Sequence, residues 1–253
     1  NRYPEQASEQ LLHAELLLRN GQPEKALQQA EKLWSKHQNA TSARLLGHIH
    51  LSLRHSNEAV KYLEQAAEAG IDSSLASTLS QAYQQQGQVN KAIALLSNYL
   101  QRRPEDFNLR FKLATVYQLN QYYPQAIEHY QQLRKLRPDN PVTWNNLAWL
   151  YQQLDDDRSL EYAREAHRLA PDRADIKDTL GWILLQFGEV TEAVELLKQA
   201  SKAIPKSDEI RFHLVKALVE GKRYKEAKPL LEKLASGQGH FKDTAKGLLD
   251  DLN

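Results

Sequence analysis

Histidines are the side chains that most invite a chemical interpretation, because nine of them occur in a chain without cysteine. Three lie close together, at His48, His50 and His55. On a helix His48 and His50 point to different sides, while His48 and His55 share a face but lie two turns apart. No cysteine and no nearby carboxylate completes the ligand set that a zinc ion requires. We therefore expect no metal, and interpret the three histidines as solvated or packing residues.

Carboxylates gather at residues 155–157, three consecutive aspartates, and at Asp175 and Asp178. The three aspartates lack the alternation and the distal glutamate of a calcium-binding EF-hand loop, so a solvated turn explains them better. Asp175 and Asp178 lie three residues apart, a spacing typical of the wet face of a helix. The sequence also lacks the G-x-S-x-G, Walker and G-x-G-x-x-G motifs. We expect no enzymatic activity and no cofactor.

Charge and composition describe an ordinary soluble chain of 253 residues, with 41% hydrophobic and 26% charged residues. Lysine and arginine total 33 against 32 acidic residues, a net charge of +1, so no long-range attraction to nucleic acid is expected. No apolar run approaches the roughly 20 residues that span a bilayer. The chain begins Asn1-Arg2-Tyr3 without methionine or a signal segment, and we interpret it as a fragment of a longer protein.

Three ladders of residues share one period and so reveal the elements that must position any functional side chain. Small residues recur at intervals of 33 or 34, leucines followed by a small or modest residue recur at the same interval, and prolines form the third ladder. The small residues are Ala26, Ala59, Ala92, Ala126, Ser159, Ala193 and Ala227; the leucines are Leu79, Leu113, Leu147, Leu180 and Leu214; the prolines are Pro104, Pro138, Pro171 and Pro205. Such a period is the signature of a repeat architecture.

Within each period, apolar residues three and four apart predict two amphipathic helices. Gly21, Gly87 and Gly188 suit the turn between them, where a left-handed backbone is needed. The small residue of the second helix allows the pair to approach closely, so that a larger side chain at Ala193 is expected to cost about 1–3 kcal/mol.

The repeat resembles the tetratricopeptide family, whose pattern is W-x2-L-G-x2-Y, then A-x3-F, then P over about 34 residues. Residues 144–151, Trp-Asn-Asn-Leu-Ala-Trp-Leu-Tyr, reproduce the first part with alanine for glycine, and Leu180-Gly181, Ala193 and Pro205 follow the pattern in the next repeat. This resemblance implies an all-α fold, a right-handed α-solenoid of about seven helix-turn-helix repeats with a closing helix.

We divide the chain into an N-terminal extension, seven units and a C-terminal capping helix. The extension is 1–6, the units are 7–39, 40–72, 73–106, 107–140, 141–173, 174–207 and 208–241, and the capping helix is 242–253. The fifth unit is one residue short in its turn, at Leu154 to Arg158.

The resemblance also implies a function, because the first helix of each tetratricopeptide hairpin lines a concave groove that binds peptide segments of partner proteins. The groove positions are the second, fifth, ninth and twelfth of each unit, with the sixth and thirteenth flanking them. The predicted partner-binding residues on this face are Arg44, Phe111, Asn145, Asn146, Trp149, Asp178, Trp182, Phe212 and Lys216. The alternative for Trp149 and Trp182 is that they fill core between hairpins.

Two other binding functions are alternatives to a peptide groove for a helical-repeat chain. A helical-repeat protein that reads RNA needs a basic reading position in every unit, and the fifth positions Phe111, Asn145 and Asp178 do not supply one. Self-association through the terminal hairpins, giving a homo-oligomeric spacer, remains the alternative to a peptide groove.

Residues 145–151, 159–163 and 178–184 are similar to segments of bacterial envelope solenoids, most of all the repeat lipoprotein of PEP-CTERM/exosortase systems, which is linked to exopolysaccharide production. This similarity implies a periplasmic or envelope-associated scaffold, and a cytoplasmic location is also compatible with a chain that has no cysteine.

Overall fold

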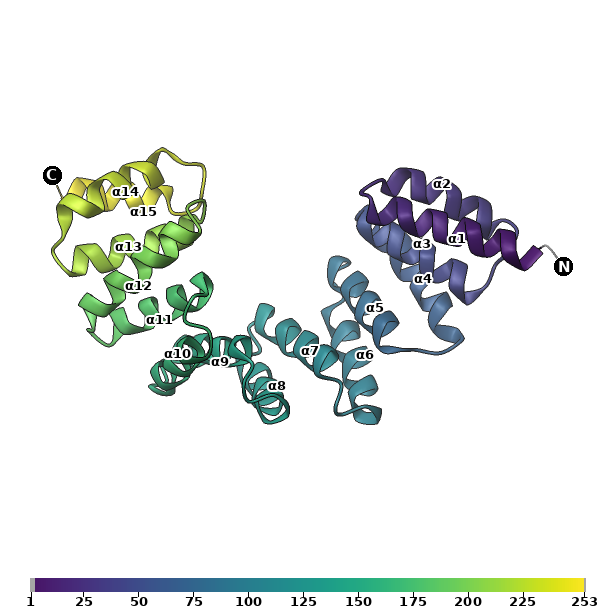
Figure 1. Ribbon diagram of the computed structural model, residues 1–253, viewed down its shortest axis with the longest axis horizontal. Coiled ribbons are helices and arrows are strands. Elements are labelled where there is room, and N and C mark those ends of the chain that lie inside the picture. Colours follow the sequence, from purple (N-terminus) through teal and green to yellow (C-terminus); the bar gives the residue numbers. More distant parts are fainter. Residues whose placement is uncertain (1–2, 253) are drawn as a thin grey trace. The chain divides into compact units, whose positions relative to one another are not determined.

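The computed structural model describes residues 3–252, which form fifteen α-helices joined by short turns and include no strand (Figure 1). In chain order the helices are α1 (Tyr3–Arg19), α2 (Pro23–Trp34), α3 (Ala40–Ser52), α4 (Ser56–Glu68), α5 (Ser73–Gln85), α6 (Val89–Arg102), α7 (Phe107–Leu119), α8 (Tyr123–Leu136), α9 (Pro141–Gln153), α10 (Arg158–Leu169), α11 (Ala174–Gln186), α12 (Val190–Ala203), α13 (Asp208–Glu220), α14 (Tyr224–Ser236) and α15 (Lys242–Asp251). The expectation of an all-α repeat fold is therefore confirmed.

The chain divides into two compact units, 1–129 and 130–253, with the division inside α8. Consecutive helices contact one another from α1 to α7 in the first unit and from α9 to α15 in the second, and the first helices of successive hairpins within a unit also contact one another. In the first unit these first helices are α1, α3, α5 and α7; in the second they are α9, α11 and α13. Each unit is thus a stack of hairpins whose first helices form one layer and whose second helices form the other.

Small residues make this stacking possible. Every member of the small-residue ladder is buried, from Ala26 to Ala227, with no more than 2% of the residue exposed. Gly47 and Gly181 hold the matching place in two of the first helices, where an added Cβ would lie 2.5 Å from Cγ of Leu63 and 2.7 Å from Cγ of Leu197. These contacts bring the two helices of a hairpin so close that only a hydrogen atom fits between the glycine and the facing leucine.

The turns between paired helices each contain a residue in the left-handed conformation. Glycine occupies it in three hairpins, with φ of 70° at Gly21, 76° at Gly87 and 77° at Gly188, as the sequence predicts. The other four turns use Arg54, Gln121, Asp155 and Lys222. A side chain at positive φ is strained, so repeat geometry here overrides the local preference of those four residues.

The fifth hairpin is one residue shorter than the others, and the missing residue falls between the left-handed residue of the turn and the small residue of its second helix. Six hairpins begin their second helix three residues before the small residue, whereas α10 begins at Arg158, immediately before Ser159. The left-handed residue Asp155 is retained, and the side chain of Asp156 accepts hydrogen bonds from the backbone and the guanidinium of Arg158. The shortening therefore removes the first helical residues of α10 and leaves the left-handed turn in place.

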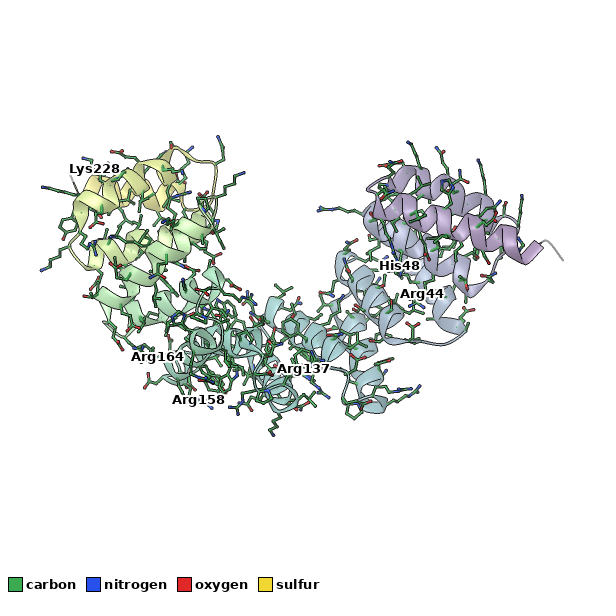
Figure 2. All side chains as sticks on the ribbon, in the orientation of Figure 1. Arg44, His48, Arg137, Arg158, Arg164 and Lys228 are labelled. Atoms are coloured by element: carbon green, nitrogen blue, oxygen red, sulfur yellow. The ribbon has the colours of Figure 1, made fainter. Side chains whose placement is uncertain are left out.

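Prolines end the second helices as expected, because α6, α8, α10 and α12 each stop two residues before the proline of the third ladder. Ion pairs join second helices that are neighbours in the second unit: Arg164 of α10 pairs with Glu189 and Glu192 at the start of α12. Figure 2 labels Arg164 on the ribbon. These exposed pairs add little individually.

Helices lie at both ends of the described chain: α1 begins earlier than the repeat pattern predicts, and α15 begins at the predicted residue. Helix α1 already begins at Tyr3, inside the segment 1–6 that we expected to be an extension; Pro4 lies in its first turn, where a missing amide proton costs nothing. Residues 1 and 2 lie outside the described part. At the other end α15 begins at Lys242 and contacts α14, with Ala245 as its buried residue. No helix within residues 3–252 has the length and apolarity to cross a bilayer.

Candidate functional site

A hollow of about 470 Å³ opens on the first-helix layer of the second unit. Helices α9, α11 and α13 supply nearly all of its lining, because residues one repeat apart fall on the same face of successive first helices. The lining residues are Asn145, Trp149, Gln152, Gln153, Asp175, Asp178, Thr179, Trp182, Ile183, Ser207, Glu209, Ile210 and His213.

Two tryptophans, Trp149 and Trp182, form the aromatic part of this hollow, and both are partly exposed. The indole of Trp182 stacks on the imidazole of His213, with ring centroids 4.3 Å apart and planes inclined by 22°. Trp144, on the same helix as Trp149, does not line the hollow. Trp144 donates from Nε1 to the carbonyl of Pro138 at 2.7 Å and lies under the guanidinium of Arg134, away from the hollow.

His213 is held in place by Asp178, whose Oδ1 accepts a hydrogen bond from Nδ1 at 2.9 Å. Both side chains are largely buried, with 15% and 14% exposed. The carboxylate of α11 thereby fixes the orientation of an α13 ring against the α11 tryptophan. The aromatic surface is therefore preorganised before any partner arrives.

Hydrogen-bond acceptors dominate the polar part of the hollow. Its lining includes the carboxylates of Asp175, Asp178 and Glu209 but no lysine or arginine. Arg173 binds Asp175 with two hydrogen bonds, which lower the pKa of that carboxyl. Oδ1 of Asn145 is buried and has no donor among the described residues. An incoming group that donates hydrogen bonds or carries positive charge would suit this lining.

The structure gathers four of the nine predicted groove residues in this hollow: Asn145, Trp149, Asp178 and Trp182. Asn146 is partly exposed on α9 and Lys216 is exposed on α13, but neither lines the hollow. Phe212 stacks on Phe241, with ring centroids 4.5 Å apart.

Two further predicted residues lie in the first unit. Arg44 forms a bidentate ion pair with Asp72, at 2.7 Å for each contact. Phe111 lines a separate hollow of about 300 Å³ with Lys112 and Thr115. The predicted residues are thus distributed over both units, and four of them share one hollow.

Nine of the thirteen lining residues were not among the predicted partner-binding residues, and four of these nine are Gln152, Gln153, Glu209 and His213. They nevertheless occupy groove positions, since Glu209 is second in its unit, Gln152 is twelfth, and Gln153 and His213 hold the flanking thirteenth and sixth positions. The position of these four residues within the repeat predicts them as groove residues. A search for large aromatic or charged side chains does not select the two glutamines.

The histidine cluster forms a packed corner. His50 and His55, rather than His48 and His55, face each other across the α3–α4 turn, with 3.4 Å between their Nδ1 atoms. The left-handed residue Arg54 reverses the chain there and so brings the two rings together. His50 also stacks on Tyr62, with centroids 5.5 Å apart. No cluster of three or more potential metal ligands occurs among residues the structure describes.

Comparison with known proteins gives matches along most of the chain. The family model for the psidin N-terminal TPR repeats region matches residues 16–171, and a tetratricopeptide repeat model matches residues 184–240. A TPR repeat-containing protein of Pseudomonas aeruginosa is 28% identical over 166 residues, which cover 62% of this chain and 27% of that protein. Another, from Methanocaldococcus jannaschii, is 33% identical over 106 residues, covering 42% and 18%. The chain thus spans only about a quarter and a fifth of the length of these relatives.

Solved structures share the fold at low sequence identity. A tetratricopeptide repeat protein from Parabacteroides merdae superposes with a TM-score of 0.67 at 13% identity, covering 78% of this chain and 79% of that one. YrrB, described as a TPR protein with an unusual peptide-binding site, gives a TM-score of 0.55 at 19% identity, covering 66% and 88%.

Proposed function

Since the chain belongs to the tetratricopeptide repeat proteins, we propose that it is a non-catalytic scaffold that holds a peptide segment of a partner protein. The binding site is the hollow between α9, α11 and α13. The observation that carries this proposal is the presence of two partly exposed tryptophans beside three carboxylates and the side-chain amide of Asn145 in one hollow. Large aromatic anchors beside a few orienting polar groups are what a peptide-binding hot spot requires.

The chemistry of the lining selects the kind of segment. Three carboxylates and no lysine or arginine line the hollow, so a segment with lysine or arginine is favoured over an acidic one. An arginine or lysine of the partner would lie over the Trp149 or Trp182 face and gain cation–π attraction. The side-chain amide of Asn145, which lines the hollow, would hydrogen-bond to the partner's backbone.

The setting that we propose is a bacterial envelope assembly, of the kind that handles exopolysaccharide. The support is the similarity of residues 145–151, 159–163 and 178–184 to the repeat lipoprotein of PEP-CTERM/exosortase systems. Cell fractionation of the full-length protein tests it. Recovery in the cytosolic fraction alone would remove the envelope from the proposal and leave the peptide groove in place.

The groove is tested by replacing both tryptophans, Trp149→Ala with Trp182→Ala, and by finding the bound segment through photo-crosslinking. A photoreactive amino acid at Gln153, which lines the hollow, captures the partner in cells, and mass spectrometry maps the crosslinked segment. A synthetic peptide of that segment then provides the binding measurement. We expect the double variant to weaken binding by at least about 100-fold, since each central aromatic anchor contributes roughly 2 kcal/mol or more.

The matched control is Tyr224→Ala, which removes an aromatic side chain that is 45% exposed on α14 and does not line the hollow. This variant should bind as the unmodified chain does. Full affinity of the double tryptophan variant would exclude the hollow as the site. Loss of its helical circular dichroism would instead assign Trp149 and Trp182 to the core.

A further inference from the structure

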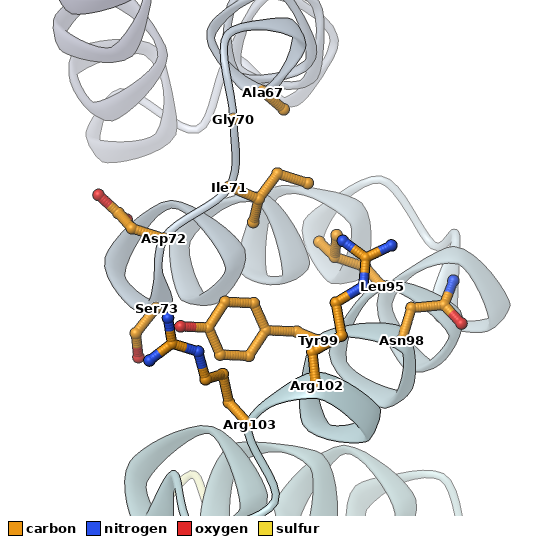
Figure 3. Close-up of a pocket in the computed structure, with 10 residues that line it drawn as sticks. All are labelled: Ala67, Gly70, Ile71, Asp72, Ser73, Leu95, Asn98, Tyr99, Arg102 and Arg103. Atoms are coloured by element: carbon orange, nitrogen blue, oxygen red, sulfur yellow. The ribbon is translucent and has the colours of Figure 1, made fainter.

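A second and larger hollow, of about 890 Å³, lies in the first unit. It opens between the C-terminal ends of α4 and α6, beside the start of α5, and Figure 3 shows its lining. The lining residues are Ala67, Gly70, Ile71, Asp72, Ser73, Leu95, Asn98, Tyr99, Arg102 and Arg103. None of them belongs to the groove described above, and most lie on second helices or on the linker between hairpins.

The apolar part of this hollow is peculiar to its place in the chain. Ile71 is 42% exposed and faces the ring of Tyr99 across the hollow (Figure 3). In the next four linkers the same position is held by a charged residue, Glu105, Asp139, Asp172 and Lys206, and in the preceding linker by Gln38. Gly70 likewise replaces the proline of those four linkers. Ile71 therefore gives this hollow an apolar side chain at a linker position that is polar or charged in the other linkers between hairpins.

The charged part is positive. Arg102 and Arg103 are both exposed, and neither forms an ion pair with any residue in the described range. Asp72 is the acidic residue of the lining, and Arg44 and the backbone N–H of Leu75 already hold its carboxylate. That carboxylate also points away from the two guanidinium groups (Figure 3). Glu68 and Glu105 are close in sequence but do not line the hollow.

We propose that this hollow binds an acidic segment of a protein partner, with an apolar side chain inserted between Ile71 and Tyr99. Guanidinium groups pair with carboxylates in a planar, two-point geometry, so Arg102 and Arg103 fit aspartate or glutamate on either side of that side chain. The apolar floor favours a peptide over a free anion, which could use the arginines alone. This surface is separate from the proposed peptide groove of the second unit and has the opposite charge preference.

The test uses the whole chain and a fluorescein-labelled peptide in which a central Leu-Phe pair is flanked on both sides by glutamates. Fluorescence anisotropy measures its affinity for the unmodified chain and for the double variant Arg102→Gln with Arg103→Gln. We expect the variant to bind at least about tenfold more weakly, because two charge-assisted contacts are lost. Added salt should weaken binding to the unmodified chain by screening these contacts.

Arg19→Gln with Lys36→Gln is the matched control, since it removes two exposed positive charges of the same unit outside the hollow. It should keep the affinity of the unmodified chain. A peptide with lysines in place of the glutamates should not bind at this hollow.

Three outcomes overturn the proposal. The first is unchanged affinity of the Arg102→Gln, Arg103→Gln variant. The second is no saturable binding of the glutamate peptide below about 1 mM, which would correspond to less than roughly 4 kcal/mol of binding free energy. The third is binding of phosphatidylserine vesicles, lost in the same variant, without binding of the peptide, because the hollow would then recognise a membrane surface.

Discussion

Asp72 illustrates how one side chain serves two elements. Its carboxylate accepts a hydrogen bond from the backbone N–H of Leu75 at 2.7 Å, and so caps the N-terminus of α5. The same carboxylate pairs with both terminal nitrogens of Arg44 on α3. The hydrogen bonds from Arg44 lower the pKa of Asp72 to about 2. Because 60% of the Asp72 side chain is exposed, water screens the ion pair and the cap is expected to contribute more.

The two roles can be separated by two substitutions at the same position. Asp72→Asn keeps an oxygen that caps α5 but removes the charge, so the free energy of unfolding should fall by no more than about 1 kcal/mol. Asp72→Ala removes both, and should cost roughly 1 kcal/mol more. Urea denaturation followed by circular dichroism measures both.

Arg44→Ala is the control for the ion pair and should match Asp72→Asn. Equal losses for Asp72→Asn and Asp72→Ala would show that the cap contributes nothing.

At the scale of the element, the hairpin is defined by how closely its two helices approach. Gly181 of α11 faces Leu197 of α12, and an added Cβ would lie 2.7 Å from Leu197 Cγ and 3.2 Å from the carbonyl oxygen of Ala193. The carbonyl belongs to the backbone of α12, so a rotamer change at Leu197 cannot relieve the whole clash. Glycine at this position is therefore a requirement of packing, since a mid-helix glycine otherwise weakens a helix.

Gly181→Ala should lower the free energy of unfolding by about 1–3 kcal/mol through overpacking. Gly247→Ala is the matched substitution in α15, where nothing lies within 4 Å of the added Cβ. That variant should be stabilised by roughly 0.5–1 kcal/mol, because alanine favours the helix. Thermal denaturation of the two variants should shift in opposite directions, and a stabilised Gly181→Ala variant would contradict the close approach.

At the scale of the whole molecule, hairpins contact their neighbours in the chain. A change that destabilises one hairpin is therefore expected to lower the stability of that hairpin and its neighbours first. Among the described residues, histidines whose pKa is lowered are unevenly distributed between the two units, with three in the first and one in the second. Burial lowers the pKa of His48, His50 and His129 in the first unit, aided by the nearby Arg44, His55 and Arg110 respectively. In the second unit burial, aided by Lys177, lowers the pKa of His167.

Acidification should therefore weaken the first unit more than the second. Each of these histidines has a lower pKa when folded than its unfolded value of about 6.5, so the unfolded chain binds more protons between the two values. Above about pH 6.5 these neutral histidines do not reduce the free energy of unfolding. As the pH falls toward their folded pKa values, that free energy decreases, because the unfolded chain takes up protons first. Hydrogen–deuterium exchange of the full chain, corrected for intrinsic rates, measures protection in each unit at pH 7.5 and pH 5.5.

The variant His48→Gln with His129→Gln removes two of the titrating groups and should reduce the pH dependence of the first unit. Equal loss of protection in both units, or a variant with unchanged pH dependence, would contradict this assignment.

Sequence alone determined the repeat, the number of helical hairpins and much of the turn chemistry. The spacing of Ala193, Leu180 and Pro205 depends on helix periodicity and backbone conformation, which are properties of residues near one another in the chain. The resemblance to tetratricopeptide repeats, rather than the spacing itself, implied the face that carries Trp149 and Trp182. The helical start of α1 at Tyr3 was missed, because the first turn of a terminal helix has no earlier repeat to compare with.

Only the tertiary structure decided which of those positions work together. It placed His213 on Trp182, neutralised Arg44 with Asp72, and turned Phe212 toward Phe241. It also opened the hollow at Ile71 and Arg102, on helix ends that no repeat pattern singled out. The physical reason is that these contacts join residues about 28 or more positions apart in the sequence, on different helices or linkers, and their distances depend on how whole helices pack rather than on the spacing of residues along the chain.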